Sequence, residues 1–416
     1  MMLTHILLVL GSVCASVSAQ NDWVYSHSPS ATGANGVSDG FSGVTHGPDK
    51  IVAVSFLCSE AEPNNTCVIA SDDGMTWTNQ EVPEKFMFTH VAYGNGKYVI
   101  VGNWGNTVNA NAVPSLVSSD AVSWTSVPGL VDNDNVVWGG LAYGNGVFVV
   151  VSMGGPARSM TSSDGVNWVS VPFYNSQNLY SGLTFGGGLF VAVGNSGRVA
   201  KSSDGVTWFE TVLTGQEVQD WTAVTYGNGL FVAVGKTAVG ADTMTQAMTS
   251  PDGVVWTARV TPKFDTWRAI AYGQGVFRAV SGSEAPTSFA AQEMMSEDGI
   301  TWTAVDLQAS TRWFGITYCG HINMFVAVGM SDDNNLMTLV PPTTTEPTTV
   351  EPTTAEPTAD DDDDGGMSRG ARIGILITII VVAFAAGYVF YKFYYRKNNL
   401  NLTFGGGSGK TPVTAV

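Results

Sequence analysis

The sequence is poor in charged residues, histidine and cysteine. Asp, Glu, Lys and Arg together make up 13% of the 416 residues, whereas 44% are hydrophobic and 48 residues are glycine. No extended stretch has the apolar period of an amphipathic helix. The formal net charge is −17 and no basic stripe occurs, which argues against a nucleic-acid ligand. These absences favour one large all-β domain.

Motifs of common catalytic sites are also missing. The five histidines include no pair with metal-ligand spacing, and no Gly-x-Ser-x-Gly elbow occurs. The C-terminal GGGSGKT is not a phosphate-binding loop, because Phe404 stands where the first glycine is needed. We therefore expect no enzymatic activity, no metal and no cofactor.

A phrase that repeats seven times indicates a β-propeller. Each copy starts with an aromatic residue, continues as an alternating run, turns tightly and returns as an apolar strand, as in WTAVTYGNGLFVAV from Trp221. Asn-Gly in the turn predicts a hairpin, because both residues tolerate positive φ. A period of roughly 40 to 50 residues with four short strands is typical of a propeller blade. The repeat-initial aromatics are Phe41, Phe88, Trp138, Tyr180, Trp221, Trp267 and Trp313.

A second phrase, Ser-x-Asp-Gly-x-x-Trp, follows each of the first six copies. Its aspartate can accept hydrogen bonds from backbone N–H groups of the turn, and its glycine supplies a left-handed residue. The phrase resembles the Asp box (BNR repeat) of sialidase-like propellers, whose usual form has one more residue between Asp and Gly. That resemblance implies a structural role for the box aspartates. We assign them to Asp73, Asp120, Asp204, Asp252 and Asp298 and, in the third copy, to position 165.

The same resemblance raises the alternative of a sialidase-like, glycan-processing ectoenzyme. Enzymes of that family use a Tyr nucleophile assisted by carboxylates. They also need three arginines that converge on the substrate carboxylate and a Phe/Tyr-Arg-Ile-Pro motif. This chain has no such motif, so we expect a non-catalytic propeller.

The two ends of the repeat region predict how the ring closes. The seventh copy is followed by only one further strand candidate, NNLMTLV. The segment NDWVYS around Trp23 has a tryptophan in the same place as the fourth strand of the other copies. Pairing of this segment with Leu336 to Val340 would complete the last blade and remove an open sheet edge. We predict a seven-bladed propeller closed by this N-terminal strand.

The repeat-initial aromatics and two arginines are the candidate ligand-binding residues. Aromatic rings can stack on sugars or peptide side chains, although packing between blades also explains a residue that recurs in every copy. Arg268 directly follows Trp267 and Arg312 directly precedes Trp313, and both depart from the repeat. The candidates are Arg268, Arg312, Trp267, Trp313, Trp221, Trp138 and Tyr180.

The chain ends predict a single-pass type I surface protein. Residues 1–19 read as a signal peptide and residues 20–340 as the propeller. Residues 341–372 form a Thr/Pro-rich and acidic stalk, residues 373–391 are an uncharged membrane-spanning segment, and residues 392–416 are a cytoplasmic tail. The last three residues, Thr-Ala-Val, resemble peptides read by PDZ-type scaffold domains.

The cysteines fit an exported protein. Cys58 and Cys67 flank a short polar loop and are expected to form a disulfide, and Cys319 is expected to be a buried free thiol. Asn64 begins the extracellular glycosylation sequon Asn-Asn-Thr. Together, these features predict a cell-surface adhesion or ligand-binding receptor at the plasma membrane, with an extracellular glycan or protein as partner. The alternatives are the ectoenzyme above and a structural coat protein without a specific ligand.

Overall fold

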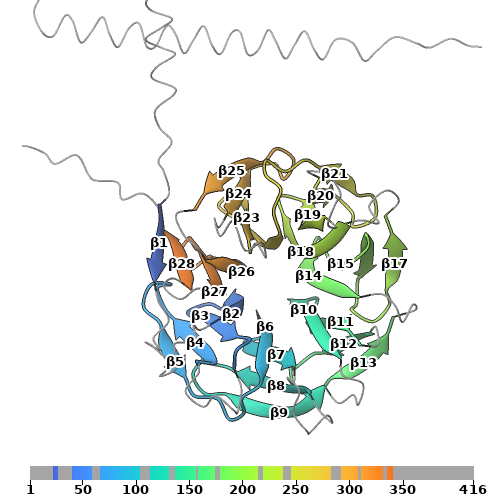
Figure 1. Ribbon diagram of the computed structural model, residues 1–416. Helices are drawn as coiled ribbons and strands as arrows, with labels where there is room; N and C mark the ends of the chain where they lie inside the picture. The colour runs from blue at the N-terminus through green and yellow to red at the C-terminus, as the bar shows by residue number, and fades with distance from the viewer. Residues whose placement is uncertain are drawn as a thin grey trace, which may run out of the picture. The chain divides into compact units, whose positions relative to one another are not determined.

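Seven antiparallel sheets of four strands each form a closed ring in the computed structural model (Figure 1). The structure describes residues 22–26, 40–58, 66–103, 113–130, 136–155, 158–173, 179–213, 219–237, 245–282, 292–307, 311–330 and 335–340. The all-β, seven-bladed prediction is confirmed. The predicted signal peptide, stalk, membrane-spanning segment and tail, and the sequon at Asn64, lie outside the described residues. Within the described ranges, no helix is long and apolar enough to cross a membrane.

Each of the first six blades is built from four consecutive strands. Blades 1 to 3 comprise β2 (Phe41–His46), β3 (Ile51–Ser55), β4 (Val68–Ser71), β5 (Thr78–Gln80); β6 (Met87–Gly94), β7 (Lys97–Asn103), β8 (Val113–Ser118), β9 (Thr125–Leu130); and β10 (Val137–Gly144), β11 (Val147–Gly154), β12 (Arg158–Ser162), β13 (Val169–Pro172). Blades 4 to 6 comprise β14 (Tyr180–Gly186), β15 (Leu189–Gly194), β16 (Arg198–Ser202), β17 (Phe209–Val212); β18 (Gln219–Gly227), β19 (Leu230–Thr237), β20 (Ala247–Ser250), β21 (Thr257–Arg259); and β22 (Trp267–Gly273), β23 (Val276–Ser281), β24 (Gln292–Ser296), β25 (Thr303–Asp306).

Blade 7 joins the two ends of the described chain. It consists of β26 (Arg312–Cys319), β27 (Met324–Met330), β28 (Leu336–Val340) and, as its outer strand, β1 (Asp22–Ser26). β1 pairs with β28 in antiparallel register, with Trp23 opposite Leu339, and the two lie side by side in Figure 1. The predicted closure by the N-terminal strand is confirmed. It leaves blade 7 with the same four-stranded order as the other blades.

A hydrogen bond to a buried ion pair of blade 6 holds this closing strand. The indole Nε1 of Trp23 donates to Oε2 of Glu293 at 2.7 Å, and the Arg278 guanidinium donates to Oε1 of the same carboxylate. Glu293 is fully buried and Arg278 is 6% exposed. Burial raises the pKa of the Glu293 carboxyl, whereas Arg278 and the Trp23 indole act to lower it. The positions equivalent to Glu293 in the other blades are Val68, Ser115, Ser159, Val199, Ala247 and Leu336.

The box geometry explains why the closing strand needs this carboxylate. In blade 4, the indole of the box residue Trp208 donates to the carbonyl of Gly205 in its own turn at 3.0 Å, and to the hydroxyl of Ser159 in the preceding blade. Trp23 occupies the equivalent place in blade 7, but no Asp-Gly turn precedes it in the sequence. Glu293, at the position of Ser159, therefore supplies the acceptor for its indole N–H.

The Asp-box turns are held by one repeated set of hydrogen bonds. In blade 4, Oδ1 of Asp204 accepts the backbone N–H groups of Val206 and Thr207 at 2.8 and 2.7 Å, while the Ser202 hydroxyl donates to Asp204 and accepts from the N–H of Gly205. These bonds show that the box aspartates stabilise the turns. The box glycines have φ between 69° and 74°, and in the degraded box of blade 2 Ala121 takes the same left-handed conformation at φ 62°.

The box assignment in blade 3 is corrected by one position. An aspartate at position 165 was wrong, because that residue is Gly165, which has φ 74° and is the left-handed glycine of the turn. The box aspartate is Asp164, whose Oδ1 accepts the backbone N–H groups of Val166 and Asn167, both at 2.8 Å. These N–H groups hold the pKa of the Asp164 carboxyl well below its usual range. The backbone N–H of Gly165 donates instead to the Ser162 hydroxyl at 2.9 Å.

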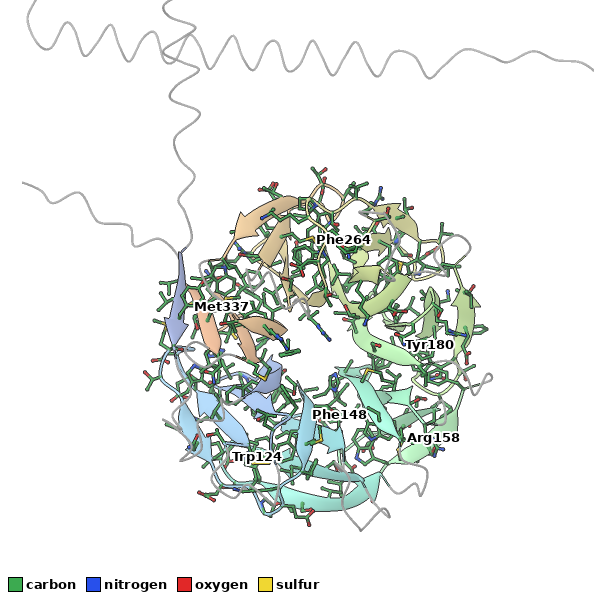
Figure 2. The ribbon with its side chains drawn as sticks, viewed as in Figure 1. Trp124, Phe148, Arg158, Tyr180, Phe264 and Met337 are labelled. Atoms are coloured by element: carbon green, nitrogen blue, oxygen red, sulfur yellow. A yellow bond between two sulfur atoms is a disulfide. The ribbon has the colours of Figure 1, made fainter. Side chains whose placement is uncertain are left out.

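The repeat-initial aromatics lie between neighbouring blades. All seven are fully buried, and each packs with residues of the blade before it. Trp138, for example, shares a hydrophobic cluster with Val99 and Val101 of blade 2. Side chains fill the spaces between the sheets, as Figure 2 shows around the labelled Tyr180. With no exposed surface, these rings act as joints between blades.

The hairpins between the first and second strands provide a second joint. Asn228 and Gly229 have φ of 49° and 76°, as a two-residue turn with both residues left-handed requires. The glycine before this turn faces the aromatic ring of the next blade. An added Cβ at Gly227 would lie 2.1 Å from Cγ of Tyr272, so only glycine allows this approach.

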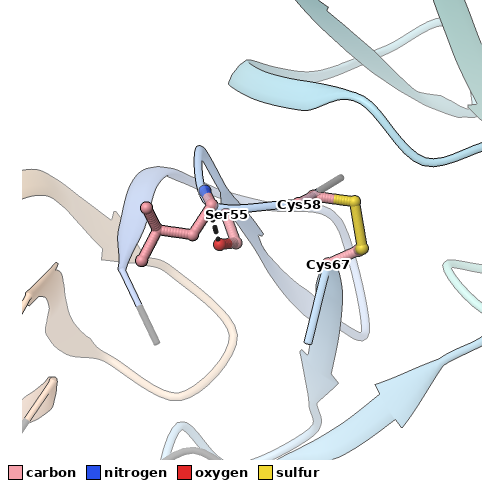
Figure 3. The surroundings of a disulfide bond; sticks show 4 residues. Ser55, Cys58 and Cys67 are labelled. Atoms are coloured by element: carbon pink, nitrogen blue, oxygen red, sulfur yellow. Dashed lines mark hydrogen bonds between the residues drawn. A yellow bond between two sulfur atoms is a disulfide. The ribbon is translucent and has the colours of Figure 1, made fainter. Parts of the chain in front are cut away.

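Two of the three described cysteines are joined in blade 1. Cys58 and Cys67 form a disulfide between the end of the segment after β3 and the start of β4, with Cα atoms 4.9 Å apart (Figure 3). In the same segment, the backbone N–H of Leu57 donates to the Ser55 hydroxyl at 3.1 Å. Cys319 is a buried free thiol, and burial raises its pKa to about 12. It is therefore an unreactive, neutral group at physiological pH.

Candidate ligand-binding cavity

A cavity of about 250 Å³ lies at the centre of the ring, lined by the innermost strand of every blade. In six blades the three residues after the repeat-initial aromatic line the cavity, and blade 2 contributes His90 and Val91. A β-bulge makes this possible, because the ladder register shifts directly after the aromatic in all seven blades, as between Trp267 and Ala269. The bulged residue has no partner opposite it in the sheet. In six blades, this residue lines the cavity: Ser42, Gly139, Ser181, Thr222, Arg268 and Phe314.

Most bulged residues are small, and two of them connect blades. The Ser42 hydroxyl donates to the carbonyl of Phe88 in the next blade at 2.9 Å. The Thr222 hydroxyl makes the equivalent bond to the carbonyl of Trp267. A small hydroxyl residue at the bulge therefore serves the closure of the ring. Arg268 and Phe314 occupy the same position without a hydroxyl group, so this structural reason does not explain them.

Arg268 and Phe314 contact one another at the cavity wall. The guanidinium carbon Cζ of Arg268 lies 5.5 Å from the centroid of the Phe314 ring, within the range of a cation–π contact. Gly282 leaves room for the arginine stem, because an added Cβ there would lie 3.2 Å from Cγ of Arg268. The Arg268 side chain is half-buried and lies next to the cavity.

His90 is the third departure from the repeat in this cavity. The second residue after the aromatic is glycine or alanine in the six other blades, whereas blade 2 has His90. Its ring is enclosed by the inner strands, and burial lowers its pKa to about 4. The imidazole is therefore neutral at pH 7. Among the described side chains, none makes a hydrogen bond to its Nδ1.

These three departures lie on one side of the ring. Arg268, Phe314 and His90 belong to blades 6, 7 and 2, which are separated only by blade 1. Blade 4, across the ring, contributes Ser181 and Gly182. At these positions the cavity is therefore asymmetric, with arginine, phenylalanine and histidine on one side and small residues opposite. Among its described lining residues, Arg268 is the single formally charged group.

The structure places only one of the two predicted arginines, Arg268, at the cavity. Arg268 lines the cavity, but Arg312 is the first residue of β26, opposite Met330 in the ladder, and does not line it. The five predicted aromatics have no exposed surface. Sequence reasoning did not select Phe314 or His90. Both can be found by comparing the seven copies column by column, since each replaces a small residue one or two places after the aromatic.

The fold and cavity define the class of this protein as a seven-bladed β-propeller. A scan against protein-family models finds no match, and a search of curated proteins finds none either. Solved structures show the fold. The chain is similar to a catalytically inactive virginiamycin B lyase from Staphylococcus aureus crystallised with quinupristin, with 13% identity, a TM-score of 0.58, and coverage of 77% of this chain and 100% of that one.

Two further solved structures belong to YCF48. The complex described as YCF48 bound to D1 peptide has 14% identity, a TM-score of 0.54, and coverage of 79% of this chain and 98% of that one. YCF48 from Cyanidioschyzon merolae has 12% identity, a TM-score of 0.52, and coverage of 77% and 99%. At these identities the likeness concerns the fold alone, which serves both a lyase and a peptide-binding protein.

Proposed function

We propose that this protein is a cell-surface, ligand-binding receptor whose propeller is non-catalytic and binds its ligand in the central cavity. The observation that carries the proposal is the gathering of Arg268, Phe314 and His90 in one cavity, at positions that are small in nearly all other copies of the repeat. Departures from a repeat are candidates for function, because the packing shared by the other copies does not require them. A half-buried arginine beside an aromatic ring suits recognition of a polar or anionic group.

The donor set supports binding more than hydrolysis. Glycoside hydrolysis of the usual kind needs a pair of carboxylates flanking the reacting bond, whereas the described lining residues are an arginine, a neutral histidine, hydroxyls and apolar groups. The ligand class within this proposal is an extracellular glycan or protein that presents a group small enough for the cavity.

The surface location rests on the sequence of the two ends and on the disulfide. The apolar N-terminal segment and the uncharged residues 373–391, followed by basic residues, support a type I topology. A buried Cys58–Cys67 disulfide fits an oxidising compartment. In this arrangement the Thr-Ala-Val end would be available to a PDZ-type scaffold in the cytosol.

Array binding by the full chain tests the proposal. The protein, produced in eukaryotic cells and labelled in detergent, is applied to arrays of glycans and of extracellular proteins. We expect a restricted set of positive spots that Arg268→Gln removes. Arg259→Gln is the matched control, because it removes one positive charge from the outer strand β21. No specific spot, or a set unchanged by Arg268→Gln, would contradict binding in the cavity.

A further inference from the structure

We propose that one face of the propeller, the box face, is an interaction surface for a protein segment that carries both basic and apolar side chains. The box face consists of the hairpin turns between first and second strands and the box turns between third and fourth strands. Both kinds of turn lie on one side of the ring, because consecutive strands of a blade are antiparallel, as in blade 3. The central cavity is lined near the start of the innermost strands and the hairpins follow their ends, so this surface is distinct from the cavity.

Each box presents one exposed apolar side chain, directly after its left-handed residue. The six side chains are 36% to 50% exposed: Met75, Val122, Val166, Val206, Val254 and Ile300. The backbone N–H of this residue bonds to the box aspartate, as Val206 does to Asp204 at 2.8 Å, but that bond does not require an apolar side chain. At the next position, which is also exposed, five of the six residues are polar: Thr76, Ser123, Asn167, Thr207 and Thr301.

Hydrophobicity is the property that the six residues share. A conformational preference for β-branched side chains does not explain them, because Met75 is unbranched and no box has threonine there, although threonine is branched like valine. Packing does not explain their exposed part either. Exposed apolar groups that are rimmed by polar residues mark interaction sites. The repeat of this position around the ring therefore indicates a surface that is covered by a partner.

The charged residues of this face are mainly acidic. Lys50 is paired with Asp72 at 2.6 Å, and Lys97 donates to the backbone carbonyl of Asp164 at 3.0 Å. The face carries nine carboxylates and three lysines: Asp49, Asp72, Asp73, Asp120, Asp164, Asp204, Asp252, Glu297 and Asp298, with Lys50, Lys97 and Lys201. Complementary charge favours a basic partner, whereas a second copy would bring two acidic surfaces together.

Hydrogen bonds between neighbouring blades hold the turns in place. The side-chain amide of Asn95 in a hairpin donates to the carbonyl of Ser163 in the next box at 3.3 Å, and that of Asn145 donates to Ser203 at 2.9 Å. The Gln274 amide donates to the next hairpin, at the carbonyl of Asn323. A surface that is ordered before binding loses less conformational entropy when the partner arrives. The acidic and apolar groups are therefore presented in a fixed arrangement.

A lipid bilayer is the competing occupant of this face. Asp22 and Val340 pair at the box-face end of β1 and β28, and in the proposed type I topology the chain continues from Val340 towards the membrane. The acidic residues disfavour lipid contact, because carboxylates would be removed from water without basic partners. A basic and apolar protein segment supplies both kinds of contact.

A labelled peptide of about 12 residues with the repeat Lys-Lys-Val-Val is a suitable probe. In an extended strand successive side chains point to opposite sides, so each side presents lysine and valine in turn. The full chain is placed in discs of zwitterionic phospholipid, and fluorescence anisotropy is measured at pH 7 with empty discs as the blank. We expect a Kd below about 0.1 mM. Peptides with Lys-Lys-Ser-Ser or Glu-Glu-Val-Val repeats should bind at least about tenfold more weakly, because each lacks one kind of contact.

Threonine variants locate the surface, since threonine keeps the shape of valine. Val206→Thr/Val254→Thr should weaken binding of the Lys-Lys-Val-Val peptide by at least about threefold, and replacing all six apolar residues by threonine should weaken it at least about tenfold. Val212→Thr/Val260→Thr is the matched control in the same two blades. These valines are 50% and 69% exposed but lie at or just beyond the opposite end of the outer strands, and we expect no change. Thermal melting shows whether each variant is folded.

Four results would overturn the inference. Binding no stronger than to empty discs would leave no site on the protein, and equal affinity for the three peptides would show that neither charge nor apolar contact is recognised. Unchanged affinity in the folded sixfold variant would place the peptide elsewhere. Quenching of tryptophan fluorescence by brominated lipid in the discs would show that the face lies on the bilayer. Arg268→Gln should leave peptide binding unchanged, so failure here is separate from failure of the array experiment on the cavity.

Discussion

Glu293→Gln should lower the free energy of unfolding by about 3–5 kcal/mol, the cost of breaking a buried ion pair from one side. Glutamine keeps the size of the side chain and can still accept the indole N–H of Trp23. The change therefore isolates the charge of Arg278, which is 6% exposed and would lose its only described carboxylate. The guanidinium also lies 5.4 Å from the Phe325 ring centroid, a contact that the variant leaves in place.

The double variant Arg278→Val/Glu293→Val gives the comparison. Valine occurs at both positions in blades 1 and 4. Replacing the whole pair by apolar residues removes both buried charges, so only the acceptor of the Trp23 indole is lost, at about 1–3 kcal/mol. We therefore expect the double variant to be more stable than Glu293→Gln alone.

Urea unfolding of the full chain at pH 7, followed by tryptophan fluorescence, measures these differences. Glu297→Gln removes a carboxylate from an exposed residue of the same blade, and we expect a change within about 0.5 kcal/mol. If Glu293→Gln cost less than about 1 kcal/mol, or if the double variant were the less stable of the two, the ion pair would not act as described in closing the ring.

Three further predictions concern the Asp boxes. Asp204→Ala should lower the free energy of unfolding by about 1–3 kcal/mol, because two turn N–H groups lose their acceptor, and the set of positive array spots should not change; intact stability with lost binding would contradict a structural box. Ala121→Gly should raise stability by about 0.5–1 kcal/mol in urea unfolding, since alanine is strained at φ 62°; a loss of stability would contradict this. Backbone N–H groups of Thr301 and Ile300 lower the pKa of Asp298 to about 2. Because its folded pKa lies below the unfolded value of about 3.9, its stabilising contribution is complete above that value and is lost as the pH falls toward 2. The melting temperature should fall over this range, and by less in Asp298→Asn; identical pH profiles would refute the assignment.

Blade number and closure could be predicted because both depend on local patterns. Each copy carries its own hairpin, box and joint aromatic, so seven copies specify seven similar sheets. The position of Trp23 matches that of a box tryptophan, which indicated its pairing with β28 before any tertiary contact was known. The disulfide was equally accessible, because its two cysteines flank one short loop.

The cavity could be predicted only in part. Arg268 and Arg312 each stand next to a repeat-initial aromatic, and spacing alone gives no reason to prefer one of them. The β-bulge after the aromatic decides the matter, since it is the following residue that lines the cavity. The Arg278–Glu293 pair was missed for a different reason. Its partners lie 15 residues apart on neighbouring strands, and Trp23, which donates to Glu293, comes from the other end of the domain.

The most direct test of the account is to fill the cavity. Ser181 lies at the bulge of blade 4 and lines the cavity, so a tryptophan in its place would occupy much of the space. Binding to the glycan and extracellular-protein arrays is recorded for the full chain and for Ser181→Trp, with Ser181→Phe as a smaller obstruction and thermal melting as the check on folding. The account predicts that the specific array signal is strong in the original chain, weaker in Ser181→Phe and lost in Ser181→Trp. An undiminished signal in a folded Ser181→Trp variant would contradict it, because the ligand would then be bound outside the cavity.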